Sequence, residues 1–255
     1  MKKEKNIKDF LDRKVREYST KDFIKDDPVL IPHLFSKKQD QEIAAFFAAI
    51  FAWGNRATII NKSKELMQKM SMEPHHFCLY ASPSELNSLK DFKHRTFTPD
   101  DLFFFIQFFR DHYSSSNTLE TAFTNGMNAN DETVENGLCH FRNYFFSNEH
   151  LRRTEKHIAS PARHSACKRI NMFLRWMVRK DAVDLGLWKK IKPTQLICPL
   201  DLHVTRVAKK FGFISRPVAD WNSALELTRN LRQFDPDDPV KYDFAFFALG
   251  VIERY

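Results

Sequence analysis

Glycine is scarce in this chain, which contains 6 glycines in 255 residues. Few glycines together with many long side chains argue against a many-turned all-β fold and favour helices. Neither GxGxxG nor GxxxxGK[ST] occurs, which excludes the common Gly-rich nucleotide loops. The G-x-S-x-G sequence of α/β hydrolases is also absent.

Cysteine is equally sparse, with four residues and no CxxC spacing. The absence of CxxC excludes the usual zinc and iron–sulfur patterns. The histidines also form no HExxH arrangement. We therefore expect no metal, no metal cluster and no cofactor. Scattered cysteines are typical of a reducing compartment.

Long apolar runs are missing too. The apolar run at 43–53 is too short for a membrane span. The N-terminal sequence MKKEKNIKDFLDRKV is too charged for a secretory signal. We therefore expect a cytoplasmic protein with no membrane partner.

Basic residues exceed acidic ones, 40 to 32, which gives a net charge of +8. Such an excess favours polyanions, of which nucleic acid is the commonest, although the chain can also simply be a basic protein. Hydrophobic residues make up 43%, including 25 phenylalanines, so a sizeable core can form. Periodicity predicts an all-α fold of about ten helices. The clearest predicted helices span residues 40–54, 55–70, 98–113, 165–180 and 222–234.

Two charged residues draw attention, Lys168 and Asp201. In the predicted helix 165–180, Lys168 lies about 150° from the centre of the apolar face, on the same side as Arg175 and Arg179. Asp201 begins another predicted helix. Taken separately, the lysine is an ordinary solvated charge and the aspartate a helix cap contributing about 1 kcal/mol.

Several sequence segments are similar to a bacterial family of uncharacterised proteins of the DUF2400 type. They are DPVLIPH (27–33), AAIFAWGNR (48–56), F.HRTF (92–97), NMFLRWMVRKD (171–181) and PLD.H..RVA (199–208). This similarity covers most of the chain.

The segment CPLDLHVTRV resembles the helix-opening VDTHV.R segment of the helix-hairpin-helix (HhH-GPD) DNA glycosylases, and the chain looks closest to their archaeal 8-oxoguanine branch. This resemblance implies that Asp201 is catalytic and that His203 and Arg206 contact DNA. It also implies that Lys168 is the lysine that attacks the sugar.

The same resemblance implies a two-lobed all-α fold with an atypical hairpin. A central lobe would span 41–199, a terminal lobe would combine 1–40 with 200–255, and a cleft would lie between them. The implied function is a DNA glycosylase/AP lyase of base excision repair that removes a damaged purine, with 8-oxoguanine the first candidate. The implied partner is duplex DNA with a damaged base, bound by a monomer.

The residue types suit this chemistry. A glycosylase takes a base out of the stack and stabilises positive charge on the deoxyribose, which a carboxylate such as Asp201 can do. Lys168 would attack C1′ and form a Schiff base. It must be neutral to attack, and we expect partial burial and the nearby cations Arg169 and Arg175 to lower its pKa.

Other residues have weaker assignments. In the turn at 52–58, Trp53 can stack on a base, and Asn55 or Arg56 can fill the gap left in the duplex by that base. The alternative is a turn at a helix end with a core tryptophan. Arg163 and His164 can contact phosphate or belong to a solvated loop. Gln107 and Trp176 are candidate base-pocket residues, although aromatic stripes are more often core.

Two further functions stay open. The hairpin of these glycosylases is Gly-rich, whereas ASPARHSACK before Lys168 has no glycine. This difference favours a non-catalytic DNA- or RNA-binding protein on the same scaffold, or an enzyme acting on structured RNA. The catalytic hypothesis requires Lys168 and Asp201 to lie close together, and every nucleic-acid hypothesis requires salt-sensitive binding.

Overall fold

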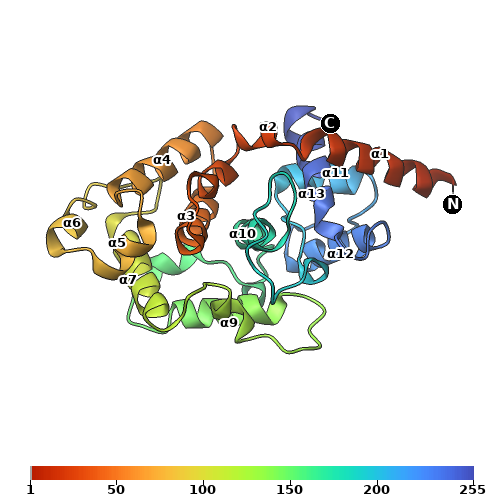
Figure 1. Ribbon diagram of the computed structural model, residues 1–255. Coiled ribbons are helices and arrows are strands. Elements are labelled where there is room, and N and C mark those ends of the chain that lie inside the picture. The colour runs from red at the N-terminus through yellow and green to blue at the C-terminus, as the bar shows by residue number, and fades with distance from the viewer. Residues whose placement is uncertain (1) are drawn as a thin grey trace. The chain divides into compact units, whose positions relative to one another are not determined.

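The computed structural model describes residues 2–255, with side chains described from residue 7 onward. Over this range it contains helices and three isolated bridges but no β-strand (Figure 1). The all-α prediction is confirmed. Within residues 2–255, each helix is too short or too polar to span a lipid bilayer.

The chain divides into two compact units. Unit 1 contains the described residues up to Phe23, residues 128–136 and residues 159–255. Unit 2 contains residues 24–127 and 137–158.

These boundaries differ from the lobes expected at 41–199 and at 1–40 with 200–255. Residues 159–199, which include the Lys168 helix, pack with the C-terminal helices instead. Lys168 and Asp201 therefore belong to the same unit.

Unit 2 is built around phenylalanine. Phe46 lies 5.5 Å from Phe109 and 5.7 Å from Phe141 between ring centroids. Such edge-to-face contacts stabilise a core beyond the burial of apolar area. The helices of this unit are α3 (Lys38–Phe51), α4 (Arg56–Lys69), α5 (Pro74–Tyr80), α6 (Pro83–Asn87), α7 (Pro99–Ser115), α8 (Thr121–Thr124), α9 (Glu135–Phe145, whose first two residues fall in unit 1) and the short η1 (Pro28–Leu30), η2 (Pro32–Leu34) and η3 (Arg152–His157).

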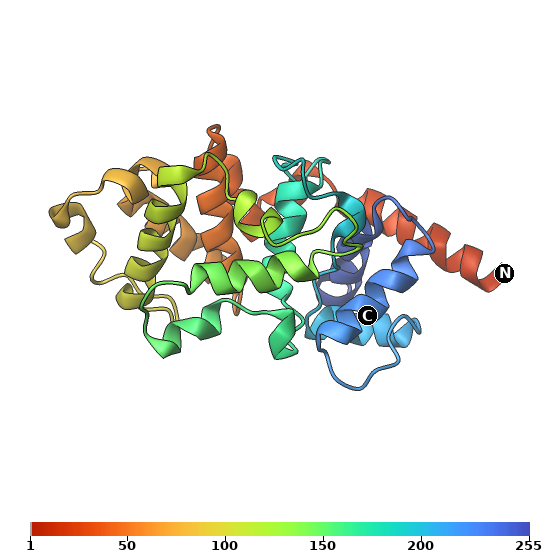
Figure 2. The same ribbon diagram turned by 90° about the horizontal axis from the view of Figure 1, so that it is seen from below.

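Unit 1 gathers both ends of the described chain. Helix α13 packs against α1 and α11 (Figures 1 and 2). The helices are α1 (Lys2–Tyr18), α2 (Lys21–Ile24, which ends at the unit boundary), η4 (Pro161–Arg163), α10 (Lys168–Val178), η5 (Pro193–Gln195), α11 (Leu202–Lys210), α12 (Trp221–Arg232), η6 (Pro239–Tyr242), α13 (Asp243–Phe247) and the π-helical η7 (Ala248–Ile252).

The connection from α10 to α11 is mostly irregular but well packed. Trp188 is buried against Phe173 of α10, with ring centroids 5.3 Å apart. Close to the start of α11, the Cys198 N–H donates to Thr228 Oγ1 of α12 at 3.0 Å. The segment leading to Asp201 is therefore held by the core of unit 1.

Candidate functional site

Lys168 is the first residue of α10. The sequence predicted a helix from residue 165, but Cys167 has a left-handed backbone (φ 51°), which interrupts helical geometry just before Lys168. The Cys167 N–H donates instead to Ser165 Oγ at 3.1 Å. Lys168 consequently lies at the N-terminal end of α10, where its side chain is 29% exposed.

Asp201 is the N-cap of α11. Its Oδ1 accepts hydrogen bonds from the N–H groups of His203 at 2.9 Å and Val204 at 3.0 Å. This is the usual way that a side chain satisfies free N–H groups at a helix start. The cap interpretation is thus correct as far as Oδ1 is concerned.

The second oxygen of Asp201 lies beside Lys168. The distance from Lys168 Nζ to Asp201 Oδ2 is 4.0 Å, and the aspartate side chain is 28% exposed. The two groups form an ion pair that is partly exposed to solvent, at a separation longer than a hydrogen bond. The structure therefore brings together the two residues that the sequence singled out.

A buried ionic network lies further along α10. Arg175, two turns after Lys168, is 4% exposed. It forms ion pairs with Asp243 and, at 3.3 Å, with Asp184. Arg179 continues the row with ion pairs to Asp184, Asp181 at 3.0 Å and Asp238 at 2.8 Å. Around Arg175 and Arg179, the polar side of the helix is covered by carboxylates rather than by water.

This network contains one of the two cations that were expected to act on Lys168. The charge of Arg175 is paired with Asp184 and Asp243. The pKa of Asp243 is raised above its ordinary value, mainly by burial. The charge of Arg175 lowers this pKa, that of Asp201 raises it and that of Lys168 lowers it. Arg169 is the second cation of the prediction, and burial lowers its own pKa to about 10.

Four further predicted DNA contacts belong to the same unit. Arg163 and His164 are exposed in the loop before α10, where His164 has a left-handed backbone (φ 57°). His203 and Arg206 are exposed on α11, and Arg206 donates to the Gly250 carbonyl at 2.9 Å. All four therefore place basic side chains on the surface of unit 1.

The remaining predicted residues in unit 2 make local contacts. Asn55 caps α4 by accepting from the Thr58 N–H at 3.1 Å. Arg56 donates to the Asp26 carbonyl at 3.3 Å. The half-buried Trp53 and the exposed Gln107 contact Arg95 and Asp111, respectively.

Trp176 requires a correction. It is fully buried on α10 and has no exposed surface, so it cannot contact a base. Its place on the helix puts it in the core of unit 1, which is the ordinary position for an aromatic residue at helical spacing.

The sequence model of a family described as "Protein of unknown function (DUF2400)" matches residues 27–252. The chain belongs to this family. No curated protein and no solved structure matches the chain.

The DUF2400 match spans the candidate pair and every weaker candidate residue. Among the described residues of this DUF2400 protein, no three His, Cys, Asp or Glu side chains are placed to hold a metal ion.

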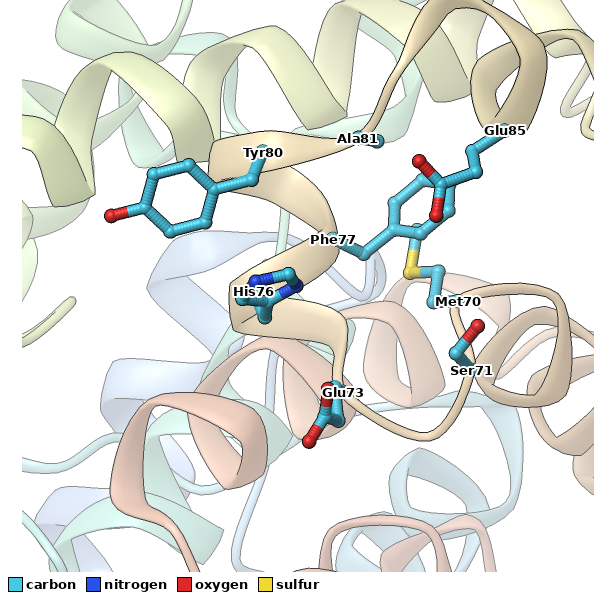
Figure 3. A pocket seen from close by; sticks show the side chains of 8 residues that line it. All are labelled: Met70, Ser71, Glu73, His76, Phe77, Tyr80, Ala81 and Glu85. Carbon is cyan, nitrogen blue, oxygen red and sulfur yellow. The ribbon is translucent and has the colours of Figure 1, made fainter.

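A separate small pocket lies in unit 2 (Figure 3). His76 and Tyr80 line it with their rings 5.0 Å apart, and Glu73 and Glu85 also line it. Its volume of about 40 Å³ admits a few water molecules but not a nucleobase. The partly exposed pair on α10 and α11 is the better candidate site.

Two groups at this site escaped the sequence analysis. Asp243 lies outside the recognised motifs, and Leu202 lies within the 199–208 segment at a position to which no role was assigned. Only the folded chain shows that the charge of Lys168 acts on Asp243 and that Leu202 is exposed. An apolar residue directly after the candidate aspartate was the one signal that could have drawn attention to Leu202.

Proposed function

We propose that this DUF2400 protein is a DNA glycosylase/AP lyase that removes a damaged purine, with 8-oxoguanine as the first lesion to test. The observation that carries the proposal is the 4.0 Å separation of Lys168 Nζ and Asp201 Oδ2, with both side chains accessible. We also propose the HhH-GPD type of fold, with residues 159–167 as an atypical hairpin.

In the proposed reaction, neutral Lys168 attacks C1′ of the deoxyribose through Nζ. The N-glycosidic bond breaks, and the base leaves with the bonding electrons and takes up a proton. Asp201 stabilises the positive charge that builds on the sugar. It also accepts the proton of the lysine ammonium through one water molecule or after a small movement, since 4.0 Å exceeds a hydrogen bond.

The second half of the reaction cleaves the strand. The C1′–O4′ bond breaks as one of the two Nζ protons passes to the ring oxygen, which leaves a protonated Schiff base between Nζ and C1′. Removal of a C2′ proton gives an enamine, which expels the 3′ phosphate as the C3′–O bond breaks. Water finally hydrolyses the Schiff base and restores Lys168.

The surface around the pair suits a polyanion. Arg163 and His164 precede Lys168, and His203 and Arg206 follow Asp201, all with exposed side chains. Arginine and histidine side chains in this arrangement can hold phosphates on either side of the attacked nucleotide. The net charge of +8 adds a general attraction to nucleic acid.

One observation favours a second candidate, a non-catalytic DNA- or RNA-binding protein. The segment before α10 has no glycine, and α10 begins without a side-chain cap. A weaker grip on phosphate at this helix start would suit a binding role without base removal.

Borohydride trapping on duplexes with one 8-oxoguanine or one abasic site separates the candidates. We expect wild type and the exposed control Lys180→Gln to form a covalent adduct, and Lys168→Gln to form none. Asp201→Asn should lose most of the adduct with 8-oxoguanine. An adduct that persists in Lys168→Gln would refute the assigned nucleophile. Salt-sensitive binding without any adduct would favour the binding protein.

A further inference from the structure

Leu202 is the first residue of α11 and directly follows Asp201. Its side chain is 82% exposed, more than any other large hydrophobic residue in the described range. By contrast, Leu200, two residues earlier, and Leu227 of α12 are buried in the core. Leu202 therefore contributes little to folding, although it stands beside the candidate pair.

The exposed side of α11 is apolar at its start and cationic behind it. His203, Arg206, Lys209 and Lys210 are exposed, while Val204, Val207 and Ala208 form the buried side.

No acidic residue occurs in residues 202–210. The three permanent cations contact neutral groups: Arg206 donates to the Gly250 carbonyl, Lys209 to the Pro217 carbonyl at 2.8 Å, and Lys210 lies 3.9 Å from the centre of the Tyr255 ring. Their charge is thus available to an anionic partner.

We propose that Leu202 is an apolar wedge that enters the base stack of duplex DNA beside the nucleotide attacked by Lys168. The cations of α11 hold the neighbouring phosphates. This assignment rests on the proposed function, because it places the DNA at Lys168 and Asp201.

The chemistry of a wedge matches what Leu202 offers. An exposed leucine gains free energy when it leaves water, and bases that part around it lose stacking but contact its apolar surface. A partner with both apolar bases and phosphates complements an apolar tip followed by cations. An anionic membrane is the other class of partner with both features, and the test below separates the two.

The test measures unstacking directly. The full chain binds a duplex that carries a tetrahydrofuran abasic analogue next to 2-aminopurine, whose fluorescence rises when it is unstacked. We expect wild type and Leu202→Met to raise the fluorescence at saturating protein. Leu202→Ala should reduce this rise several-fold, and Val218→Ala, a control at a 60% exposed position in the same unit, should not.

Borohydride trapping on a single-stranded abasic oligonucleotide provides the second readout. Because a single strand has no duplex stack to open, Leu202→Ala should be trapped there as well as wild type. Equal fluorescence for Leu202→Ala and wild type would overturn the wedge, as would loss of trapping by Leu202→Ala on the single strand. Leucine-dependent binding to phosphatidylserine vesicles without a fluorescence change on the duplex would overturn it too.

The two proposals can fail separately. If wild type forms no adduct with any substrate, the proposed enzyme is refuted. The fluorescence of the unreactive duplex still decides whether Leu202 opens the stack.

Discussion

The two carboxylate oxygens of Asp201 make different contacts, and one of them faces Lys168. Oδ1 accepts from the first N–H groups of α11, while Oδ2 lies 4.0 Å from Lys168 Nζ. The cap orients the carboxylate, so the position of Oδ2 follows from the fold of α11. One residue can therefore cap a helix and take part in chemistry.

Substitutions at Asp201 should separate these two contributions. Asparagine caps helices about as well as aspartate, so Asp201→Asn should change the free energy of unfolding by less than about 0.5 kcal/mol, whereas Asp201→Ala should lose about 1 kcal/mol. Both should lose most of the adduct with 8-oxoguanine. Urea unfolding measures the difference, and an asparagine variant less stable than the alanine variant would contradict the cap.

Arg175 should be essential for the stability of unit 1. Arg175→Met leaves Asp184 and Asp243 buried with one cation fewer, which should cost about 3–5 kcal/mol. The exposed Arg229→Met is the matched control and should stay within about 0.5 kcal/mol of wild type. Urea unfolding of both variants measures this, and a loss below about 1 kcal/mol for Arg175→Met would refute the network's role.

Asp101 should make unit 2 sensitive to acid. Burial alone raises the pKa of this carboxyl group. The close contact with His157, whose Nε2 lies 3.3 Å from Oδ2, and hydrogen bonds from Thr154 and Thr98 outweigh burial and hold the pKa well below its ordinary value. Because the folded-state pKa is depressed, this stabilisation is present above the unfolded pKa of about 3.9 and is lost as pH falls toward the folded pKa.

Asp101→Asn tests this assignment. The variant should be less stable by about 1.5–3 kcal/mol near neutral pH, because it loses charge-assisted hydrogen bonds. Its stability should also change less between about pH 5 and about pH 3 than that of wild type. Parallel pH profiles from urea unfolding would show that another group causes the acid sensitivity.

Arg206 should contribute one phosphate contact. Binding to an undamaged duplex should weaken steeply with salt, and Arg206→Gln should reduce the slope of log K against log salt by about 1. The exposed Arg13→Gln, which removes the same charge from α1, should leave the slope nearly unchanged. An equal effect of both substitutions would mean that only the net charge matters.

Much of the local structure follows from sequence. The helices predicted at 40–54, 55–70 and 98–113 correspond to α3, α4 and α7 within a few residues, because apolar periodicity and turn residues mark them. The start of α10 could not be predicted, since nothing in the residue type of Cys167 indicates its left-handed backbone.

Long-range packing set the limits of prediction. Arg175 and Arg179 have the period of a polar helix face, and only contacts with distant carboxylates such as Asp238 and Asp243 show that this face is buried. The same is true of Trp176, whose burial depends on neighbouring helices. By contrast, Lys168 and Asp201 were paired from a local resemblance, and their distance depends on how residues 179–200 pack.

The most direct test of the account is the identity of the residue that is trapped. The wild-type protein is reduced with borohydride on a duplex with one abasic site, digested, and analysed by mass spectrometry. We expect the peptide containing Lys168 to carry the reduced sugar remnant on that lysine. A remnant on any other lysine, or no adduct at all, would contradict it.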